Sequence, residues 1–301
     1  ASADADVDAS SGSTSTSSSP PPQRETAPTP IDGTRFICMP RGKLGKIVCG
    51  DLVLWEWSSS LADSSAFIVE VLPRSTIFDR VDRNSKDGRD KVLLASNFHH
   101  ICIVCAPQPA TNGTLLDRYI AAAQQMRVNV SIIFNKIDLK EEATKFEQDM
   151  ADYERIGIPV FRTSCEEGAE QGIDQLRQHL ATVGPGGTPG ITIFVGQSGS
   201  GKSSLLNTLS PSLQLQVNEL SKNHQGRHTT TQTILHQLES GGEIIDSPGF
   251  QNYIPAPLPL REVMNGFNEF QQPAKFCYYG SRCLHLTEPC CGVRMAIRPS
   301  A

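Results

Sequence analysis

One segment of the chain has the residue types and the spacing to hold a polyphosphate. Residues 196–203 read GQSGSGKS and directly follow the apolar run Ile191–Val195. In such a loop the glycines let backbone N–H groups turn inward around a phosphate at the start of a helix, and the lysine reaches the terminal phosphates. An accidental Gly/Ser-rich turn is the alternative, which the preceding apolar strand disfavours. The candidate phosphate-binding residues are Gly196, Gln197, Ser198, Gly199, Ser200, Gly201, Lys202, Ser203 and Ser204.

A second segment could read the base of a nucleotide. Asn135, Lys136 and Asp138 follow the apolar run 131–134. A carboxylate at position 138 can accept from the ring N1–H and the exocyclic amine of guanine, and adenine lacks this pair of donors. Ser164 and Cys165 follow another short apolar strand, where a backbone N–H could contact the guanine oxygen. A polar turn after a strand would give the same letters, so this segment alone leaves both interpretations open.

Two further polar segments could complete a site for Mg²⁺ and the γ-phosphate. Asp246 ends the apolar run 243–245, where it could hold Mg²⁺ through water, and the Gly249 N–H could bind the γ-phosphate. Thr229 and Thr230 lie between the phosphate loop and Asp246, in a segment that a solvated threonine-rich loop would also explain. The candidate magnesium ligands are Ser203, Thr230 and Asp246.

The cysteines near the carboxyl end of the chain predict a metal site. Nine cysteines are an odd number in a chain without a secretory signal, which favours metal binding and buried thiols over disulfides. Cys277, Cys283, His285 and Cys291 can supply three thiolates and an imidazole, a closed tetrahedral set suited to structural zinc. Cys290, beside Cys291, is an alternative ligand.

Two other cysteines, Cys102 and Cys105, form a C-x-x-C pattern. They lie inside the apolar run 100–106, which predicts a strand. Because residues three apart in a strand point to opposite faces, we expect buried thiols here, not a metal or redox pair.

The apolar runs predict the elements that must position these segments. From residue 100 onward, strand-like runs alternate with helix-like runs, which predicts a parallel sheet covered by helices. The expected strands are 100–106, 130–134, 159–163 and 191–195, and the expected helices are 115–126, 140–156 and 172–180. The carboxyl ends of parallel strands meet at one edge of a sheet, so we expect the candidate loops to meet there.

The first part of the chain follows a different pattern. Short β-branched runs at 51–57 and 66–72 are broken by glycines and Pro73, which predicts a small antiparallel barrel or sandwich. The polar loop at 86–90 marks the expected domain boundary. The basic residues of 41–46 would lie in an early loop of this barrel, where contact with nucleic acid and a merely solvated loop are both open.

Composition sets the broad class. The chain has 301 residues, of which 38% are hydrophobic and 20% charged, enough for two or three globular domains. Residues 1–33 are rich in Ser, Thr and Pro, and we expect them to be a disordered tail. The tail carries most of the formal net charge of −5, so the folded part is close to neutral and RNA contact is permitted. Neither a transit peptide, a secretory signal nor a membrane-spanning run is recognised, so we expect a cytoplasmic protein with no membrane partner.

Taken in order, these segments resemble the RsgA (YjeQ) family of bacterial GTPases that depend on the small ribosomal subunit. The base-reading segment precedes the phosphate loop, the reverse of the usual order. A doubly wound sheet keeps such a site intact after its termini are joined and the chain is cut elsewhere. The resemblance covers roughly residues 34–297 and rests on residues 135–138, 196–203, 226–231, 246–250, and Cys283 to His285 followed by Cys291.

The resemblance implies an α/β protein with three parts. These are an N-terminal OB-fold β-barrel over 34–90, a circularly permuted P-loop GTPase domain with a doubly wound, mostly parallel sheet over 91–255, and a zinc-binding module over 256–301. The implied activity is GTP hydrolysis, stimulated by the small ribosomal subunit during its late maturation, with rRNA bound through the OB-fold and the zinc module. The implied cofactors are GTP or GDP, Mg²⁺ and one structural Zn²⁺, and we expect a monomer.

The resemblance also points to a catalytic residue. Phe250 stands where many GTPases carry the glutamine that orients the attacking water, so another side chain must position that water. His228 is the family's candidate, because an imidazole can accept from water at neutral pH. A structural or RNA-contacting histidine is the alternative. Intrinsic turnover is expected to be slow, at ~10⁻⁴ to 10⁻² per second.

Two other functions compete with this interpretation. A P-loop kinase or ATPase would share the phosphate loop, but the guanine-reading pattern of residues 135–138 disfavours it. A non-hydrolysing RNA-binding scaffold is disfavoured by the complete phosphate loop. Nucleotide preference separates the first alternative from a GTPase, and turnover separates the second.

Overall fold

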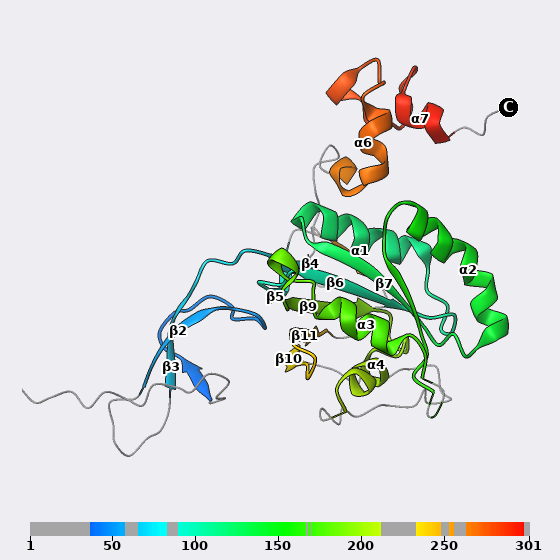
Figure 1. Ribbon diagram of the computed structural model, residues 1–301. Coiled ribbons are helices and arrows are strands. Elements are labelled where there is room, and N and C mark those ends of the chain that lie inside the picture. The colour runs from blue at the N-terminus through cyan, green and yellow to red at the C-terminus, as the bar shows by residue number, and fades with distance from the viewer. Residues whose placement is uncertain are drawn as a thin grey trace, which may run out of the picture.

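The protein is built around a six-stranded sheet in the middle of the chain (Figure 1). The computed structural model describes residues 37–57, 66–82, 90–166, 168, 170–211, 233–247, 253–255 and 263–297. The sheet has the order β10-β11-β9-β6-β7-β8, in which only β10 runs antiparallel to its neighbour. Its strands are β6 (His100–Cys105), β7 (Asn129–Asn135), β8 (Val160–Thr163), β9 (Ile191–Gly196), β10 (Ile234–Gln237) and β11 (Glu243–Asp246).

Helices cover both faces of this sheet (Figure 1). On one face, α1 (Gly113–Met126) and α2 (Lys140–Arg155) bury residues such as Leu116 and Met150 against β6 and β7. On the other face lie α3 (Ile173–Leu180) and α4 (Lys202–Leu209), and a short 3-10 turn, η1 (Pro185–Gly187), leads from α3 into β9. Cys105 belongs to the first of these cores and Cys102 to the second, which confirms that the two thiols point to opposite faces.

The order of the strands shows how the chain is permuted. The chain runs outward through β6, β7 and β8, then returns to the centre of the sheet at β9, beside β6. If strand numbering began at β9, the sheet would read second, third, first, fourth, fifth, sixth, a continuous doubly wound arrangement. The predicted parallel α/β fold with permuted order is therefore confirmed.

The N-terminal strands form two small sheets. A three-stranded sheet has the order β1-β3-β2, with β1 (Cys38–Pro40), β2 (Val53–Trp57) and β3 (Ala66–Val71). A two-stranded sheet pairs β4 (Ile77–Val81) with β5 (Lys91–Ser96). β2–β3 and β4–β5 are antiparallel as predicted, but β1 lies parallel to β3. The chain passes through β2 between these two strands, so no tight hairpin joins β1 to its neighbour in the sheet.

The two small sheets meet around Asp51. Cys49, shortly before β2, forms an isolated bridge with Ala95 of β5, and the Ser96 N–H donates to the Cys49 carbonyl at 3.0 Å. β4 ends before residue 90 and β5 begins after it. The domain boundary that we expect at residue 90 therefore falls between two strands that pair with each other.

A partly buried ion pair links the segments that carry the two small sheets. Arg74 Nε donates to Asp51 Oδ1 at 2.6 Å and Arg74 Nη2 to Asp51 Oδ2 at 2.8 Å. Ser96 Oγ, from the end of β5, donates to the same carboxylate at 2.6 Å. Burial alone would raise the pKa of the Asp51 carboxyl, but the hydrogen bonds from Arg74, Ser96 and the Val48 N–H outweigh it and leave the pKa lowered.

The C-terminal module packs on α1. It comprises η3 (Met264–Gly266), α6 (Asn268–Ala274), η4 (Gly280–Arg282) and α7 (Gly292–Ile297), and lies beside α1 in Figure 1. Gly266 approaches Ala121 so closely that a Cβ at position 266 would press on the Ala121 side chain. The Asn268 N–H donates to Gln124 Oε1 at 3.1 Å. Within the described ranges, none of the helices is long and apolar enough to cross a bilayer.

Removing the cation of the Arg74–Asp51 ion pair should destabilise the N-terminal strands. Arg74→Met leaves the Asp51 carboxylate, whose side chain is 1% exposed, without its counter-charge. We expect the free energy of unfolding at pH 7 to fall by about 3 kcal/mol. Urea unfolding can be followed by tryptophan fluorescence, because both tryptophans of the chain, Trp55 and Trp57, lie in β2.

The pH dependence and a matched control test the cause. A carboxyl with a lowered folded pKa stabilises above its unfolded pKa of about 3.9 and loses that contribution as pH falls through the folded pKa, so the gap between wild type and Arg74→Met should close toward pH 3. Arg155→Met breaks an exposed pair, with side chains 69% and 53% exposed, and should cost less than about 1 kcal/mol. Equal losses in the two variants would contradict a structural role for the Asp51 pair.

Candidate functional site

The phosphate loop connects β9 to α4 at the carboxyl edge of the sheet. Lys202 is the first residue of α4 and is buried. Its Nζ donates to the backbone carbonyls of Gly196, at 3.0 Å, and Gln197, at 2.9 Å. Burial lowers the pKa of Lys202 to about 8, and the nearby Asp246 carboxylate partly opposes this. Phosphate oxygens placed here would supply the negative charge that favours the charged lysine.

Asn135, at the end of β7, ties the base-reading segment to the phosphate loop. Its Nδ2 donates to the backbone carbonyl of Ser200 at 3.0 Å, and its Oδ1 accepts from Thr163 Oγ1 at 3.0 Å. The close approach requires glycine at position 201, where φ is +93° and a Cβ would overlap Asn135 Nδ2. One buried side chain therefore connects β7, β8 and the phosphate loop.

Lys136 makes a second connection to the same loop. Its backbone adopts a left-handed conformation with φ of +64°, which an ordinary residue seldom does. Its Nζ donates to the carbonyls of Gly199, at 2.8 Å, and Gln108, at 2.9 Å. Burial lowers the pKa of Lys136, and the neighbouring Asp138 opposes this effect. The lysine thus spans from the base-reading segment to the phosphate loop.

Asp138 is oriented by the loop that follows β8. Ser164 Oγ donates to Asp138 Oδ1 at 2.7 Å and accepts from the Glu166 N–H at 3.2 Å. Ser164 is fully buried, and its backbone pairs with Gln171. Cys165, half-buried, lies next to it with Sγ 3.8 Å from Asn135 Oδ1. The structure brings together the residues predicted to read guanine.

Asp246 is the last residue of β11, which pairs with β9, the strand before the phosphate loop. It is 3% exposed and pairs in register with Phe194 of β9, two residues before Gly196. Ser247 Oγ donates to the Phe194 carbonyl at 2.5 Å, which fixes the chain directly after Asp246. A carboxylate here lies close enough to raise the pKa of Lys202. Asp246 ends β11, the strand beside β9, and Ser203 lies in α4, which follows the loop. Both residues thus lie next to the phosphate loop, as a shared Mg²⁺ would require.

The donor set fits a nucleotide phosphate. Ser200 Oγ is buried and, in the described part of the chain, makes no hydrogen bond. Among the described residues, Lys202 Nζ donates to the backbone carbonyl oxygens of Gly196 and Gln197. The other predicted site residues, His228, Thr229, Thr230 and Gly249, lie outside the described residues.

Sequence reasoning missed some residues of the site. Gln108 supplies a carbonyl to Lys136 from the loop after β6. A backbone carbonyl carries no sequence signal, so only the position of the loop at the carboxyl edge of the sheet could have suggested it. Thr163, recognised only as a neighbour of Ser164, holds the Asn135 amide in its orientation.

The cysteines and histidine of the C-terminal module converge. One potential ligand atom from each of four residues lies within 4.8 Å of the others, in a set formed by Cys277, Cys283, His285 and Cys291. Cys277 Sγ lies 3.9 Å from Cys291 Sγ and 3.4 Å from His285 Nδ1. Ligands around a tetrahedral zinc with bonds of about 2.0–2.3 Å would be separated by roughly 3.5–3.8 Å. The neighbouring Cys290 is exposed, so Cys291 is the residue that joins the cluster.

Backbone donors surround the clustered sulfurs. The Gly292 N–H points to Cys277 Sγ at 3.3 Å, and the Arg294 N–H points to Cys291 Sγ at 3.5 Å. Although burial by itself would raise the pKa of Cys291, the Arg294 N–H and the neighbouring cluster side chains lower it to about 7. Glu288 accepts from three backbone N–H groups, at positions 284, 286 and 287, and so shapes the loop that carries His285. These donors favour the thiolate of Cys291, the form that binds metal, whereas burial raises the pKa of Cys283 to about 11, so a bound cation would have to stabilise the thiolate there.

Comparison with known proteins gives consistent matches. A protein named small ribosomal subunit biogenesis GTPase RsgA from Chromohalobacter salexigens is 37% identical over 268 residues, which are 88% of this chain and 74% of that protein. One of the same name from Pseudomonas fluorescens is 35% identical over 276 residues, 91% of this chain and 76% of that protein.

Solved structures give the same answer. The crystal structure of YjeQ from Thermotoga maritima is 26% identical with a TM-score of 0.63, covering 88% of this chain and 84% of that one. The crystal structure of YloQ, described as a circularly permuted GTPase, is 26% identical with a TM-score of 0.57, covering 86% and 78%. A profile of the RsgA GTPase family matches residues 71–254. The permuted strand order, the converging loops and these similarities together establish that the chain belongs to the RsgA GTPase family.

Proposed function

We propose that this protein hydrolyses GTP in the late maturation of the small ribosomal subunit, and that the small subunit stimulates the hydrolysis. The observation that carries the nucleotide assignment is the contact of Asn135 and Lys136 with the carbonyls of Ser200 and Gly199. These contacts hold a guanine-reading segment beside a phosphate loop. The relatives' names, small ribosomal subunit biogenesis GTPase, support the partner.

Each group has a role that follows from its chemistry. Asp138 accepts from the two donors of guanine, and the loop at Ser164 and Cys165 offers backbone N–H groups to the base oxygen. Residues 196–204 surround the phosphates, and Lys202 neutralises them. Ser203, Asp246 and Thr230 would hold Mg²⁺, which neutralises the charge that develops on the phosphoryl oxygens. His228 is the proposed residue that positions the attacking water.

The rest of the chain would supply the contact with rRNA. We assign residues 34–90 to an OB-fold, 91–255 to the GTPase domain and 256–301 to the zinc module, behind a tail at 1–33. Arg41, Lys43 and Lys46 are exposed after β1, and Phe276 and Tyr278 are 76% and 79% exposed in the C-terminal module. Basic side chains and exposed aromatic rings are the groups that bind single-stranded RNA. We place the protein in the cytoplasm as a monomer.

Turnover tests the proposed function. The purified full chain should hydrolyse GTP slowly, at ~10⁻⁴ to 10⁻² per second, and leave ATP intact. Small ribosomal subunits should raise the rate at least about tenfold, and large subunits should not. Phosphate release measured with each nucleotide and each subunit gives the answer. Slow GTP turnover that neither subunit changes would keep the nucleotide site but remove the partner.

We also propose that Cys277, Cys283, His285 and Cys291 hold one structural Zn²⁺. The chain offers a matched pair of variants, because Cys290 and Cys291 are adjacent and only Cys291 joins the cluster. Cys291→Ser should lower the zinc bound per chain and lower the protease resistance of the C-terminal module, since a small module depends on its metal to fold. Cys290→Ser should retain both.

Metal content by atomic emission and limited proteolysis with and without chelator measure these effects. A loss of zinc in Cys290→Ser with retention in Cys291→Ser would contradict the assignment. If both variants retain their zinc, the ion is held by other residues, and the assignment is wrong.

A further inference from the structure

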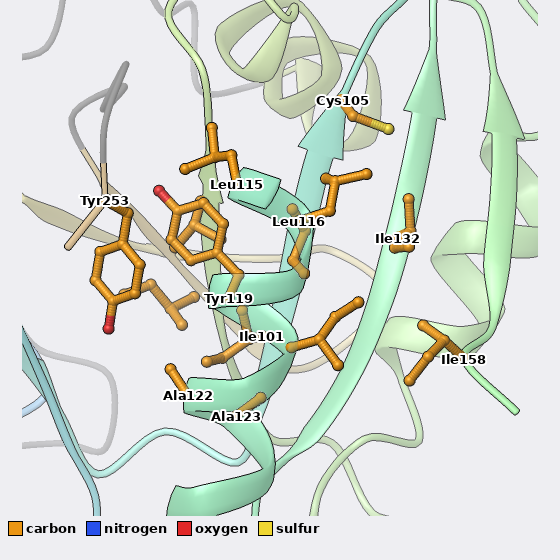
Figure 2. Close-up of a cluster of buried hydrophobic side chains, with 14 of the residues drawn as sticks. Ile101, Cys105, Leu115, Leu116, Tyr119, Ala122, Ala123, Ile132, Ile158 and Tyr253 are labelled. Carbon is orange, nitrogen blue, oxygen red and sulfur yellow. The ribbon is translucent and has the colours of Figure 1, made fainter. Parts of the chain in front are cut away.

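Three buried aromatic rings meet where the N-terminal hairpin touches the GTPase domain. Phe78 comes from β4, Tyr119 from α1, and Tyr253 from the three-residue segment 253–255 that follows β11 in the described chain. The ring centroids of Tyr119 and Tyr253 are 4.5 Å apart, and those of Phe78 and Tyr253 are 5.1 Å apart. All three rings are at most 2% exposed. Figure 2 shows Tyr119 and Tyr253 side by side next to the α1 residues that cover the sheet.

The backbone around Tyr253 is tied to both neighbours. The Tyr253 hydroxyl donates to the Asp79 carbonyl at 3.2 Å, and the Val81 N–H donates to the Ile254 carbonyl at 3.1 Å. On the opposite side, Arg118 Nη1 of α1 donates to the Tyr253 carbonyl at 3.4 Å. Tyr253 and Asp79 are 174 residues apart in the sequence. Tyr253 is thus held between the hairpin and α1 by its ring and by its main chain.

The cluster also reaches the nucleotide site. Val195, the residue directly before Gly196 and the phosphate loop, belongs to the same buried core as Tyr119 and Tyr253. Burial raises the pKa of the Tyr119 hydroxyl most, with a smaller contribution from Tyr253, while the Gly196 backbone lowers it. A continuous buried core therefore runs from Val195, next to Gly196, through Tyr119 and Tyr253 to Phe78 of β4.

We propose that Tyr253 is a positioning residue that couples the phosphate loop to the N-terminal β4–β5 hairpin. A nucleotide that orders Gly196 restrains Tyr119, and the Tyr119 ring restrains Tyr253 between α1 and β4. Packed aromatic rings have few alternative arrangements, so a small displacement at one end changes the contact at the other. The inference rests on the proposed function for its ligand, a guanine nucleotide, but not for its partner.

Hydrogen exchange of the Val81 amide tests this coupling, because its acceptor is the Ile254 carbonyl beside Tyr253. In the wild-type full chain, the peptide containing Val81 should exchange about tenfold more slowly with bound GDP or a non-hydrolysable GTP analogue than without nucleotide. In Tyr253→Leu the ratio should fall below about twofold, because the stack is lost. Tyr253→Phe keeps the rings and should keep most of the difference.

A matched control separates coupling from the loss of any tyrosine contact at α1. Tyr153 lies in α2, and its hydroxyl donates to Asp117 of α1 at 2.8 Å. Tyr153→Phe removes this contact, which does not involve the hairpin. It should leave the exchange ratio unchanged. If Tyr253→Leu does not fold, Tyr253→Met, which keeps side-chain length, takes its place. A wild-type ratio near one, or a ratio that persists in the Leu or Met variant, would overturn the proposal.

A second readout separates this proposal from the proposed partner. With small ribosomal subunits, Tyr253→Leu should lose about tenfold of the stimulation while its unstimulated GTP turnover changes less than about threefold. Equal loss of both rates would overturn the coupling, because it would indicate damage to the nucleotide site itself. If wild-type protein shows no stimulation, the proposed partner fails, and the exchange ratio still decides the role of Tyr253.

Discussion

The site depends on one contact, the hydrogen bond from Asn135 Nδ2 to the Ser200 carbonyl. The base-reading segment and the phosphate loop are distant in the chain and meet only because β7 and β9 flank β6 in a parallel sheet. Adjacent parallel strands bring their following loops to the same edge, and the Asn135 amide then fixes the separation between these two loops. Gly201 has no Cβ to block the approach, and Thr163 holds the amide in place. A buried amide that makes several hydrogen bonds is costly to disrupt, so this contact stabilises the geometry on which guanine and phosphate recognition rely.

Helix α1 contacts both the β4–β5 pair and the C-terminal module. Its Tyr119 packs on the aromatic cluster that contains the hairpin residue Phe78, and its Ala121 and Gln124 receive the C-terminal module. A nucleotide-dependent change at the phosphate loop can thus reach either module through one helix. Regulation by an RNA partner would need such a connection.

Much of the site could be predicted from sequence because its chemistry depends on short, local patterns. The phosphate loop and residues 135–138 lie where the apolar strand patterns placed them, and the order of the segments was enough to infer the permuted sheet. The four zinc-type ligands were predicted from their residue types, and they converge in the structure. Contacts through the main chain or between distant elements left no such pattern. The Gln108 carbonyl, the parallel placement of β1 and the packing of Tyr253 on Tyr119 depend on tertiary structure alone. The spacing around Cys290 and Cys291 left two ligands open, and the fold of the loop distinguishes them.

The central claim is that residues 135–138 and 196–203 form a single guanine nucleotide site, and binding of GDP and xanthosine diphosphate to Asp138→Asn tests it most directly. An amide at position 138 can no longer accept from both guanine donors, whereas xanthine presents a carbonyl where guanine has its amine. The account predicts that GDP affinity falls about a hundredfold and that xanthosine diphosphate becomes the tighter ligand. Asp174→Asn, at a carboxylate 88% exposed on α3, should change neither affinity. Unchanged GDP affinity in Asp138→Asn would contradict the account, because the base would then be read elsewhere.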